Sequence, residues 1–127
     1  MSWQIIPLEE VAPTAWRNGG GITRELLAWP TAQDWDWRIS VAEVEKSGPF
    51  SPYEGVQRWF AVLGGAGVRL TLDGQSRELT PQGEPLCFDG ALGCDCELID
   101  GPTEDFNLML KKGRGSARLV RVLGALD

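Results

Sequence analysis

The sequence contains no histidine, although the chain is 127 residues long. Imidazole is the commonest protein ligand for transition metals, and it is the base in Ser-His-Asp and Cys-His catalytic groups. The composition therefore excludes a histidine-ligated metal centre and both of these catalytic arrangements. We predict a protein that binds no metal and needs no cofactor, so that carboxylates, arginines and backbone amides carry any chemistry.

Cysteine is scarce as well. The three cysteines are Cys87, Cys94 and Cys96, and an odd number cannot form a complete disulfide framework. Cys94 and Cys96 lie two residues apart and lack the CxxC spacing of a zinc site. We interpret all three as buried or incidental thiols. The N-terminus has neither a basic leader nor a long apolar stretch, so we expect a reducing, cytoplasmic location.

Long apolar runs and excess basic charge are also absent. Apolar runs such as residues 59–63 are much shorter than the roughly 20 residues that span a bilayer. The 12 basic residues are outnumbered by 18 acidic ones, and a net charge of -6 does not suit binding to a phosphate backbone. We therefore expect no membrane span and no nucleic-acid partner. With 43% hydrophobic and 24% charged residues, residues 1–127 are expected to form one folded domain.

Short strands dominate the predicted secondary structure. Apolar and polar residues alternate over residues 37–42 and 68–72, which is the period of a half-buried strand. Asp73-Gly74 is a strong two-residue hairpin signal, and a return strand should follow at residues 76–79. Further short strands are predicted at residues 21–27, 57–63, 86–88, 94–99, 106–110 and 117–123.

The first quarter of the sequence is less regular. Prolines interrupt residues 1–33, which we treat as an irregular N-terminal segment with one helical turn near residues 8–12. Barrel strands are expected over residues 34–123, with a turn at residues 47–49. Many short strands at this spacing favour an all-β barrel or sandwich.

Four separated blocks resemble the HutD/Ves family of the cupin superfamily. They are residues 16–26 (WRNGGGITREL), 36–42 (DWRISVA), 47–51 (SGPFS) and 101–109 (GPTEDFNLM). In addition, the glycine-bearing bend at residues 63–67, Asp73-Gly74 and Pro81-Gln82-Gly83 resemble the central hairpin of a cupin.

The resemblance implies a cupin-type double-stranded β-helix barrel, or jelly roll, which in this family often has a second barrel-like half. Such relatives usually continue beyond residue 127, so we expect either a truncated bicupin or a divergent tail. In the first case the strand near residues 117–123 would be an exposed edge, which favours a homodimer. The resemblance also implies a link to bacterial histidine utilisation and a small carboxylate ligand such as urocanate or N-formylglutamate.

The glycine-rich block is the first candidate for a ligand contact. Glycines let backbone N–H groups approach an anion, and an arginine supplies a planar fork of donors. Arg17, Asn18, Gly19 and Gly20 are therefore predicted to hold a carboxylate. The alternative is a glycine-rich turn whose arginine pairs with a nearby acid.

The strand that begins at Trp37 places Arg38 and Ser40 on one face, and Trp37 and Glu43 on the other. If the Arg38 face lines the barrel, the guanidinium needs a partner, which would be Glu25, Glu43 or a carboxylate of the ligand. If the tryptophan face lines the barrel, Arg38 is simply solvated.

Three more polar residues complete the candidate site. Arg58 stands where a cupin often has metal ligands, so it is a candidate for a fixed positive charge in place of the metal; the alternative is an exposed arginine at a strand edge. Asp105 and Asn107 have the parity expected for a polar interior and are predicted to complete the hydrogen bonds of the ligand. The alternative is that Asp105 caps a turn.

These residues leave three functions open. We favour a non-catalytic sensor or regulatory protein that binds a small organic acid, because the sequence offers convergent donors without a clear proton-transfer pair. The first alternative is a metal-free isomerase, lyase or hydrolase, whose acid or base would be Glu25, Glu43, Tyr53 or Asp105. The second alternative is an interaction domain with a vestigial pocket.

Overall fold

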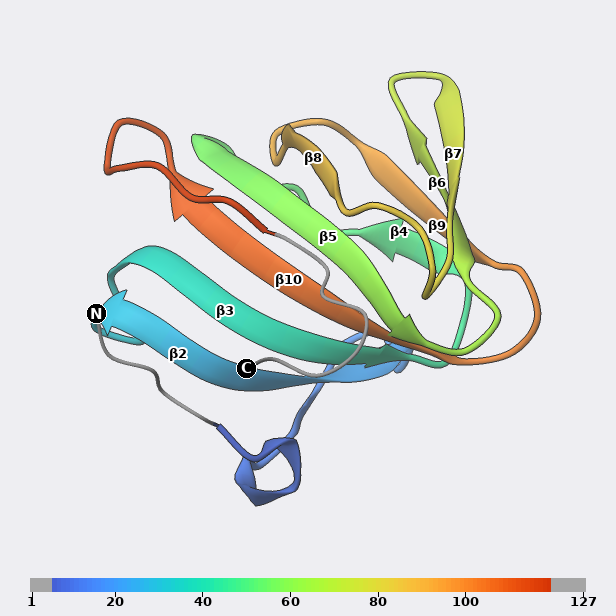
Figure 1. Ribbon diagram of the computed structural model, residues 1–127, viewed down its shortest axis with the longest axis horizontal. Coiled ribbons are helices and arrows are strands. Elements are labelled where there is room, and N and C mark those ends of the chain that lie inside the picture. The colour runs from blue at the N-terminus through green and yellow to red at the C-terminus, as the bar shows by residue number, and fades with distance from the viewer. Residues whose placement is uncertain (1–5, 120–127) are drawn as a thin grey trace.

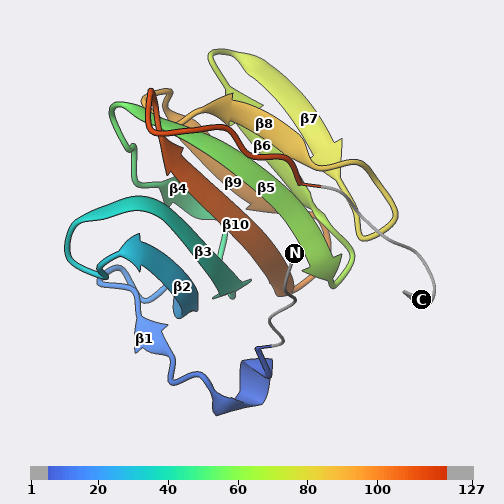
Figure 2. The ribbon, with the colours of Figure 1, turned by 60° about the vertical axis from the view of Figure 1, so that its left-hand side comes forward.

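The computed structural model describes residues 6–119, which form ten strands and one 3-10 helical turn, Leu8–Glu10. The strands are β1 (Thr14–Ala15), β2 (Gly21–Pro30), β3 (Trp35–Val44), β4 (Gly48–Phe50), β5 (Val56–Gly64), β6 (Val68–Leu72), β7 (Gln75–Leu79), β8 (Leu86–Asp89), β9 (Cys94–Leu98) and β10 (Thr103–Lys111). They form two sheets that lie face to face, as Figures 1 and 2 show. The all-β prediction and the helical turn are both confirmed.

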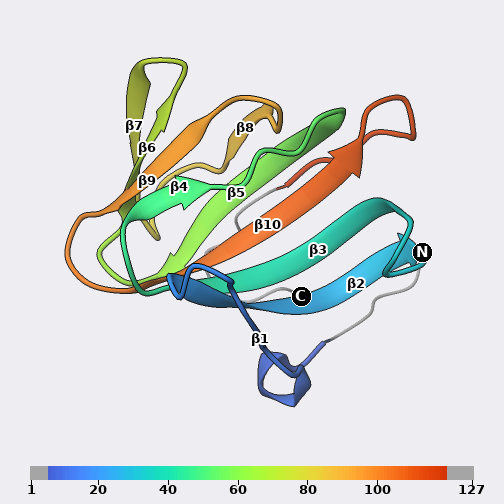
Figure 3. The ribbon, with the colours of Figure 1, turned by 180° about the vertical axis from the view of Figure 1, so that it is seen from behind.

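The two sheets are built from strands that are not sequential neighbours. The larger sheet has the order β1-β2-β3-β10-β5-β8, and the smaller sheet has the order β4-β9-β6-β7. Neighbouring strands pair antiparallel throughout both sheets. Figure 3, seen from behind, shows the edge strands β1 of the larger sheet and β4 of the smaller sheet on the side nearer the viewer. Two antiparallel sheets, with connections that cross from one sheet to the other, form the expected jelly roll.

The hydrophobic core lies between the sheets, where β5 and β8 face β6 and β9. Its buried residues are Phe60, Val62, Val68, Leu70, Leu79, Phe88, Cys94 and Cys96. Cys94 and Cys96 both point into this core because they lie two apart on β9. Both thiols are free, and burial raises the pKa of Cys96 to about 12. Their spacing is therefore a strand pattern, as the sequence indicated.

The hairpin predicted at Asp73-Gly74 is present. Asp73 has a φ of 49° and Gly74 a φ of 77°, which is the backbone of a type I′ turn. This turn joins β6 to β7, and the register pairs Leu72 with Gln75. The return strand begins one residue earlier than the sequence predicted.

The irregular N-terminal segment is shorter than predicted. β2 pairs with β3 from Gly21 to Pro30, so the larger sheet begins well before residue 34. The register shifts between Glu25 and Leu27. Such an irregularity breaks the strict alternation by which a strand is recognised in a sequence. A second shift, between Trp29 and Pro30, lies in the part of β2 that the prediction of residues 21–27 left out.

The turn predicted at residues 47–49 is wrong, and the strand predicted at residues 117–123 is absent from the part of it that the structure describes. Residues 48–50 form strand β4 instead of a turn, and β4 pairs with β9 at the edge of the smaller sheet, where a proline is tolerated. Of the strand predicted at residues 117–123, residues 117–119 are not in a strand. The rest of that segment lies outside the described residues.

Candidate functional site

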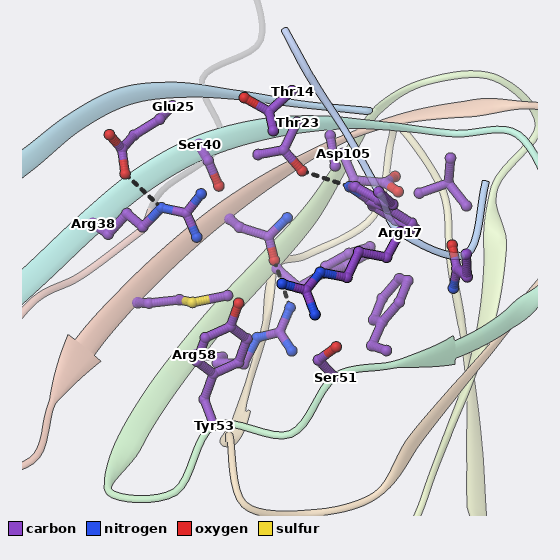
Figure 4. A pocket seen from close by; sticks show the side chains of 18 of the residues that line it. Thr14, Arg17, Thr23, Glu25, Arg38, Ser40, Ser51, Tyr53, Arg58 and Asp105 are labelled. Atoms are coloured by element: carbon purple, nitrogen blue, oxygen red, sulfur yellow. Dashed lines mark hydrogen bonds and ion pairs between the residues drawn. The ribbon is translucent and has the colours of Figure 1, made fainter. Parts of the chain in front are cut away.

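A cavity of about 550 Å³ opens on the inner face of the larger sheet. Its walls come from β1, β2, β3, β5 and β10, together with β4 and the segment that follows β4. Figure 4 shows that Arg17, Arg38 and Arg58 extend into this space from three different parts of the chain. The cavity therefore gathers guanidinium groups that are far apart in the sequence.

The register of the central strands explains which side chains face the cavity. Arg38 of β3 and Arg58 of β5 both lie opposite Met109 of β10. One step along, Ser40 and Phe60 flank Asn107 in the same way. The next step places Asp105 between Ala42 and Val62. Because alternate residues point to the same face, the inward rows all come from one parity of each strand.

Arg58 is the most deeply placed of the arginines and is only 5% exposed. Its Nη2 donates a hydrogen bond to Oδ1 of Asn107 at 2.9 Å, and its Nε has no partner. The guanidinium carbon lies 5.2 Å from the ring centroid of Phe88 and 5.7 Å from those of Phe50 and Tyr53. Burial lowers the pKa of Arg58. The alternative of an exposed strand-edge arginine is therefore wrong.

Arg58 lacks an acidic partner within the part of the chain that the structure describes. Its one hydrogen-bond acceptor, the side chain of Asn107, is neutral. An arginine cannot discharge by losing its proton at ordinary pH. The site thus holds a buried positive charge that is only partly compensated.

Arg38 has the partner that the sequence suggested. Its Nε donates to Oε1 of Glu25, on the neighbouring strand β2, at 2.8 Å. Ser40 lies one row further along the same face and is buried. Arg17 is exposed, and in Figure 4 its side chain reaches from the loop before β2 into the cavity. The cavity therefore holds three guanidinium groups, of which one, Arg38, is ion-paired with Glu25.

Asp105 forms another part of the cavity wall and is completely buried. Its Oδ2 accepts a hydrogen bond from Oγ1 of Thr103 at 3.1 Å, whereas its Oδ1 has no partner. Burial raises the pKa of Asp105 to about 7. This carboxyl group therefore changes charge near neutral pH. The bond to Thr103 joins two side chains of β10 and caps no turn, so the alternative of a turn cap is wrong.

Gly19 and Gly20 are not part of the cavity lining. The N–H of Gly20 donates to Oδ1 of Asn18 at 2.8 Å, and the N–H of Gly19 donates to the carbonyl of Trp16 at 3.1 Å. These amides are used within the loop, which agrees with the turn proposed as the alternative. The ion pair that this alternative gave to Arg17 is not found within residues 6–119. Asn18 does line the cavity, and its side chain holds the turn that carries Arg17.

Glu43 also lies outside the cavity, because its parity on β3 places it on the outer face of the larger sheet. There it pairs with Arg24, with a distance of 3.2 Å between Nη1 and Oε1. Thr23 and Met109, which the sequence analysis did not single out, do line the cavity. Thr23 has the same parity on β2 as Glu25, and Met109 has the same parity on β10 as Asn107. The alternation of side chains along each strand could therefore have identified both as cavity residues.

Metal-binding clusters and membrane-spanning helices are both absent from residues 6–119. Across residues 6–119, no group of three or more cysteine, aspartate or glutamate side chains is arranged to hold a metal ion. No helix in the same part of the chain is long and apolar enough to cross a membrane. The candidate site thus rests on the arginines, Asp105, Asn107 and the aromatic walls.

Two facing antiparallel sheets with a cavity on the larger one define a protein of the cupin type. A solved Thermotoga maritima protein, described as a predicted oxalate decarboxylase, matches with a TM-score of 0.68 over 85% of this chain. A cupin domain of an Enterobacter cloacae transcriptional regulator matches with a TM-score of 0.60 over 72% of the chain. Identities of 15% and 18% mean that these similarities concern the fold alone.

Within that fold, the chain belongs to the HutD family, whose sequence model matches residues 8–125. An uncharacterised 21.2 kDa protein from the hutC 3′ region of Pseudomonas putida is 39% identical over 119 residues, which cover 91% of this chain and 62% of that protein. Protein Ves of Cronobacter sakazakii is 32% identical over 117 residues, which cover 91% of this chain and 65% of that protein.

A solved member of the family has the same architecture. The structure of HutD from Pseudomonas fluorescens SBW25, in a formate condition, matches with a TM-score of 0.79 and 38% identity, over 84% of this chain and 59% of that one. The chain therefore spans about three fifths of the length of these relatives. The resemblance read from the four sequence blocks is confirmed, and the names of two of these relatives refer to hut genes.

Proposed function

We propose that the protein binds a small carboxylate in its cavity, without a metal ion, and acts as a sensor or regulator. The observation that carries the proposal is the state of Arg58. This guanidinium is 5% exposed and borders a cavity of about 550 Å³, with a neutral hydrogen-bond acceptor in Asn107. A carboxylate guest is the counter-charge that such a group requires.

The energetics favour a charged guest at Arg58. Removing an ion from water costs several kcal/mol, whereas contacts of a cation with aromatic rings return only about 0.5–2 kcal/mol each. A carboxylate can accept two parallel hydrogen bonds from one guanidinium, and such charge-assisted bonds are about twice as strong as neutral ones. The rings of Phe50 and Tyr53, which line the cavity beside Arg58, would keep water away from that pair.

The other charges of the cavity support the same proposal. Arg38 is compensated by Glu25, and Arg17 adds a positive charge at the exposed side. Asp105 adds a full negative charge only when the pH is above about 7. The lining is therefore positive around neutrality, although the whole chain carries a net charge of -6.

The names of the relatives suggest which acids to test. One relative is encoded in the hutC 3′ region, and a solved relative is HutD itself. We therefore propose an acid of histidine degradation, urocanate or N-formylglutamate, as the guest. Both are small enough for the cavity and both carry a carboxylate.

A calorimetric and thermal-shift series tests the proposal. Urocanate, N-formylglutamate, glutamate and formate are titrated into the protein, and an acid at a hundred times its Kd should add about 2.7 kcal/mol to the free energy of unfolding. Arg58→Gln should abolish binding. The matched control is Arg69→Gln, because Arg69 pairs with Glu78 and Glu97 on the exposed face of the smaller sheet. Equal binding by wild type and Arg58→Gln would refute the site.

A second candidate function is metal-free acid–base catalysis, and one observation favours it. A carboxyl group with a pKa of about 7 in a cavity is suited to proton transfer at neutral pH. Asp105 would be the acid or base, because Glu25 is held in an ion pair and Glu43 faces away from the cavity. Turnover of a bound acid that disappears in Asp105→Asn would establish catalysis, and binding without turnover would exclude it for the acids tested.

A further inference from the structure

Asp105 is an acidic side chain of the cavity wall to which carboxylate binding at Arg58 gives no direct contact with the guest. It lies on β10, the strand that also carries Asn107, the hydrogen-bond partner of Arg58. Its neighbours across the sheet are Ala42 and Val62, which offer no hydrogen bond from their side chains. The only hydrogen bond to its carboxylate within residues 6–119 comes from Thr103, and Oδ1 has no donor.

A buried carboxylate oxygen without a donor destabilises a folded protein. Such an oxygen has left water and has gained no hydrogen bond in return. An apolar side chain of the same size would stabilise this wall more than an aspartate does. The arrangement becomes favourable only when a donor arrives. Asp105 borders the cavity but is 0% exposed, so a guest reaches Oδ1 only when the wall around this side chain opens.

We infer that Asp105 forms a second recognition point, which accepts a hydrogen bond from an N–H group of the guest. The inference rests on the proposed function, since it assumes that a carboxylate of the same guest binds at Arg58. The guest class is then a small carboxylic acid with an amide, imidazole or ammonium N–H at its far end. Formate and simple fatty acids fall outside this class.

The spacing along β10 sets the length of such a guest. Asp105 and Asn107 are two residues apart, which is about 7 Å along an antiparallel strand. Asn107 lies at the end of the site where the carboxylate would bind, because its Oδ1 accepts a hydrogen bond from Nη2 of Arg58 at 2.9 Å. A five-carbon acid with its N–H group at the other end has a comparable length, so a matched series of such acids can test both points together.

The groups around Asp105 define the pH at which the test is run. Two titratable groups interact electrostatically with Asp105. The charge of Glu104, its neighbour on β10, raises the pKa of Asp105, and the charge of Asp105 raises the pKa of Cys96 on β9. Cys96 stays a neutral thiol at pH 8, because its pKa is about 12. Since burial raises the pKa of Asp105 to about 7, the carboxyl is mostly ionised at pH 8 and acts as an acceptor.

The experiment compares four acids by calorimetry at pH 8. Pentanoate ends in a methyl group, glutaramate in a primary amide, 5-aminopentanoate in an ammonium group, and N,N-dimethylglutaramate in an amide without N–H. We expect glutaramate or 5-aminopentanoate to bind about tenfold or more tightly than pentanoate, which is the range of a hydrogen bond to a charged group. The stronger of the two shows whether the donor is neutral or charged.

Two variants locate the effect. Asp105→Leu should bind glutaramate, 5-aminopentanoate and pentanoate without a preference for the N–H acids, and Asp105→Asn, with a neutral acceptor, should keep part of the preference. The inference is overturned if wild type shows no preference, if the preference survives in Asp105→Leu, or if the dimethyl amide binds as tightly as glutaramate. If no acid binds at all, the proposed function fails too, whereas acids that bind through Arg58 without any N–H preference overturn this inference alone.

Discussion

Arg58 and Asp105 are both buried in the wall of one cavity, but they respond differently to pH. Arg58 keeps its charge at any ordinary pH. Asp105 can take up a proton, and its pKa of about 7 means that the folded protein holds that proton more tightly than the unfolded chain does. The free energy of unfolding must therefore depend on the state of this carboxyl group.

The sign of that dependence follows from linkage. The folded-state pKa of Asp105 lies above the ordinary value of 3.8, so its favourable contribution is complete below pH 4 and is lost as the pH rises to about 7. The loss amounts to about 4 kcal/mol, from about 1.4 kcal/mol for each unit of pKa difference. We expect Asp105→Asn to be more stable than wild type at pH 8 and nearly equal to it at pH 4.

Urea unfolding at the two pH values measures this difference. The matched control is Asp95→Asn, because Asp95 is an exposed aspartate on β9. A constant difference between Asp105→Asn and wild type from pH 4 to pH 8 would show that folding does not raise the pKa of Asp105.

Single residues also show where the sequence was and was not sufficient. Parity alone places Asp105 and Asn107 on one face of their strand, and the structure agrees. Parity could not decide whether the Arg38 face or the Trp37 face of β3 points inward. The outer face of β3, with Trp37, Ile39 and Val41, is the more apolar one, so hydrophobicity alone would have favoured the wrong side.

At the scale of elements, the contact between the start of β2 and the end of β3 holds the glycine-rich loop against the larger sheet. A Cβ atom on Gly21 would lie 2.3 Å from the carbonyl oxygen of Glu43, which is backbone and cannot turn away. Gly21 pairs with Val44 at this end of the β2–β3 ladder. Glycine is therefore required here by close approach of the two strands.

Gly21→Ala should lower the free energy of unfolding by about 2 kcal/mol or more, because the strands must separate to admit the methyl group. Gly48→Ala is the control: Gly48 also lies in a strand, and a Cβ there meets nothing within 4 Å. Thermal unfolding of both variants compares them directly. Equal stability of the two would mean that the backbone of β2 adjusts freely.

The same elements explain which strands were predicted well. β6 and β7 have clear alternation and a strong turn signal, and their bounds agree closely with expectation. The sequence predicted β2 too short and did not predict β4 as a strand. β2 contains a register shift, and β4 is a short edge strand with a central proline, so neither shows the local pattern by which strands are recognised.

For the whole molecule, pairing between distant parts of the chain should govern folding. β10 is the last strand of residues 6–119, yet it pairs with β3 on one side and β5 on the other, so the larger sheet closes only when remote segments meet. Folds with this topology refold in milliseconds to seconds. Stopped-flow refolding, followed by the fluorescence of the six tryptophans, should fall in that range. Refolding in microseconds would contradict the observed strand order.

The position of β10 has a consequence for the protein as it is made. Asp105, Asn107 and Met109 all come from this strand, and Asn107 is the residue that holds Arg58. A nascent chain that has left the ribosome only as far as β9 has its arginines but lacks the strand that separates and orients them. Under the proposed function, recognition of a guest should therefore begin only after residue 111 has left the ribosome.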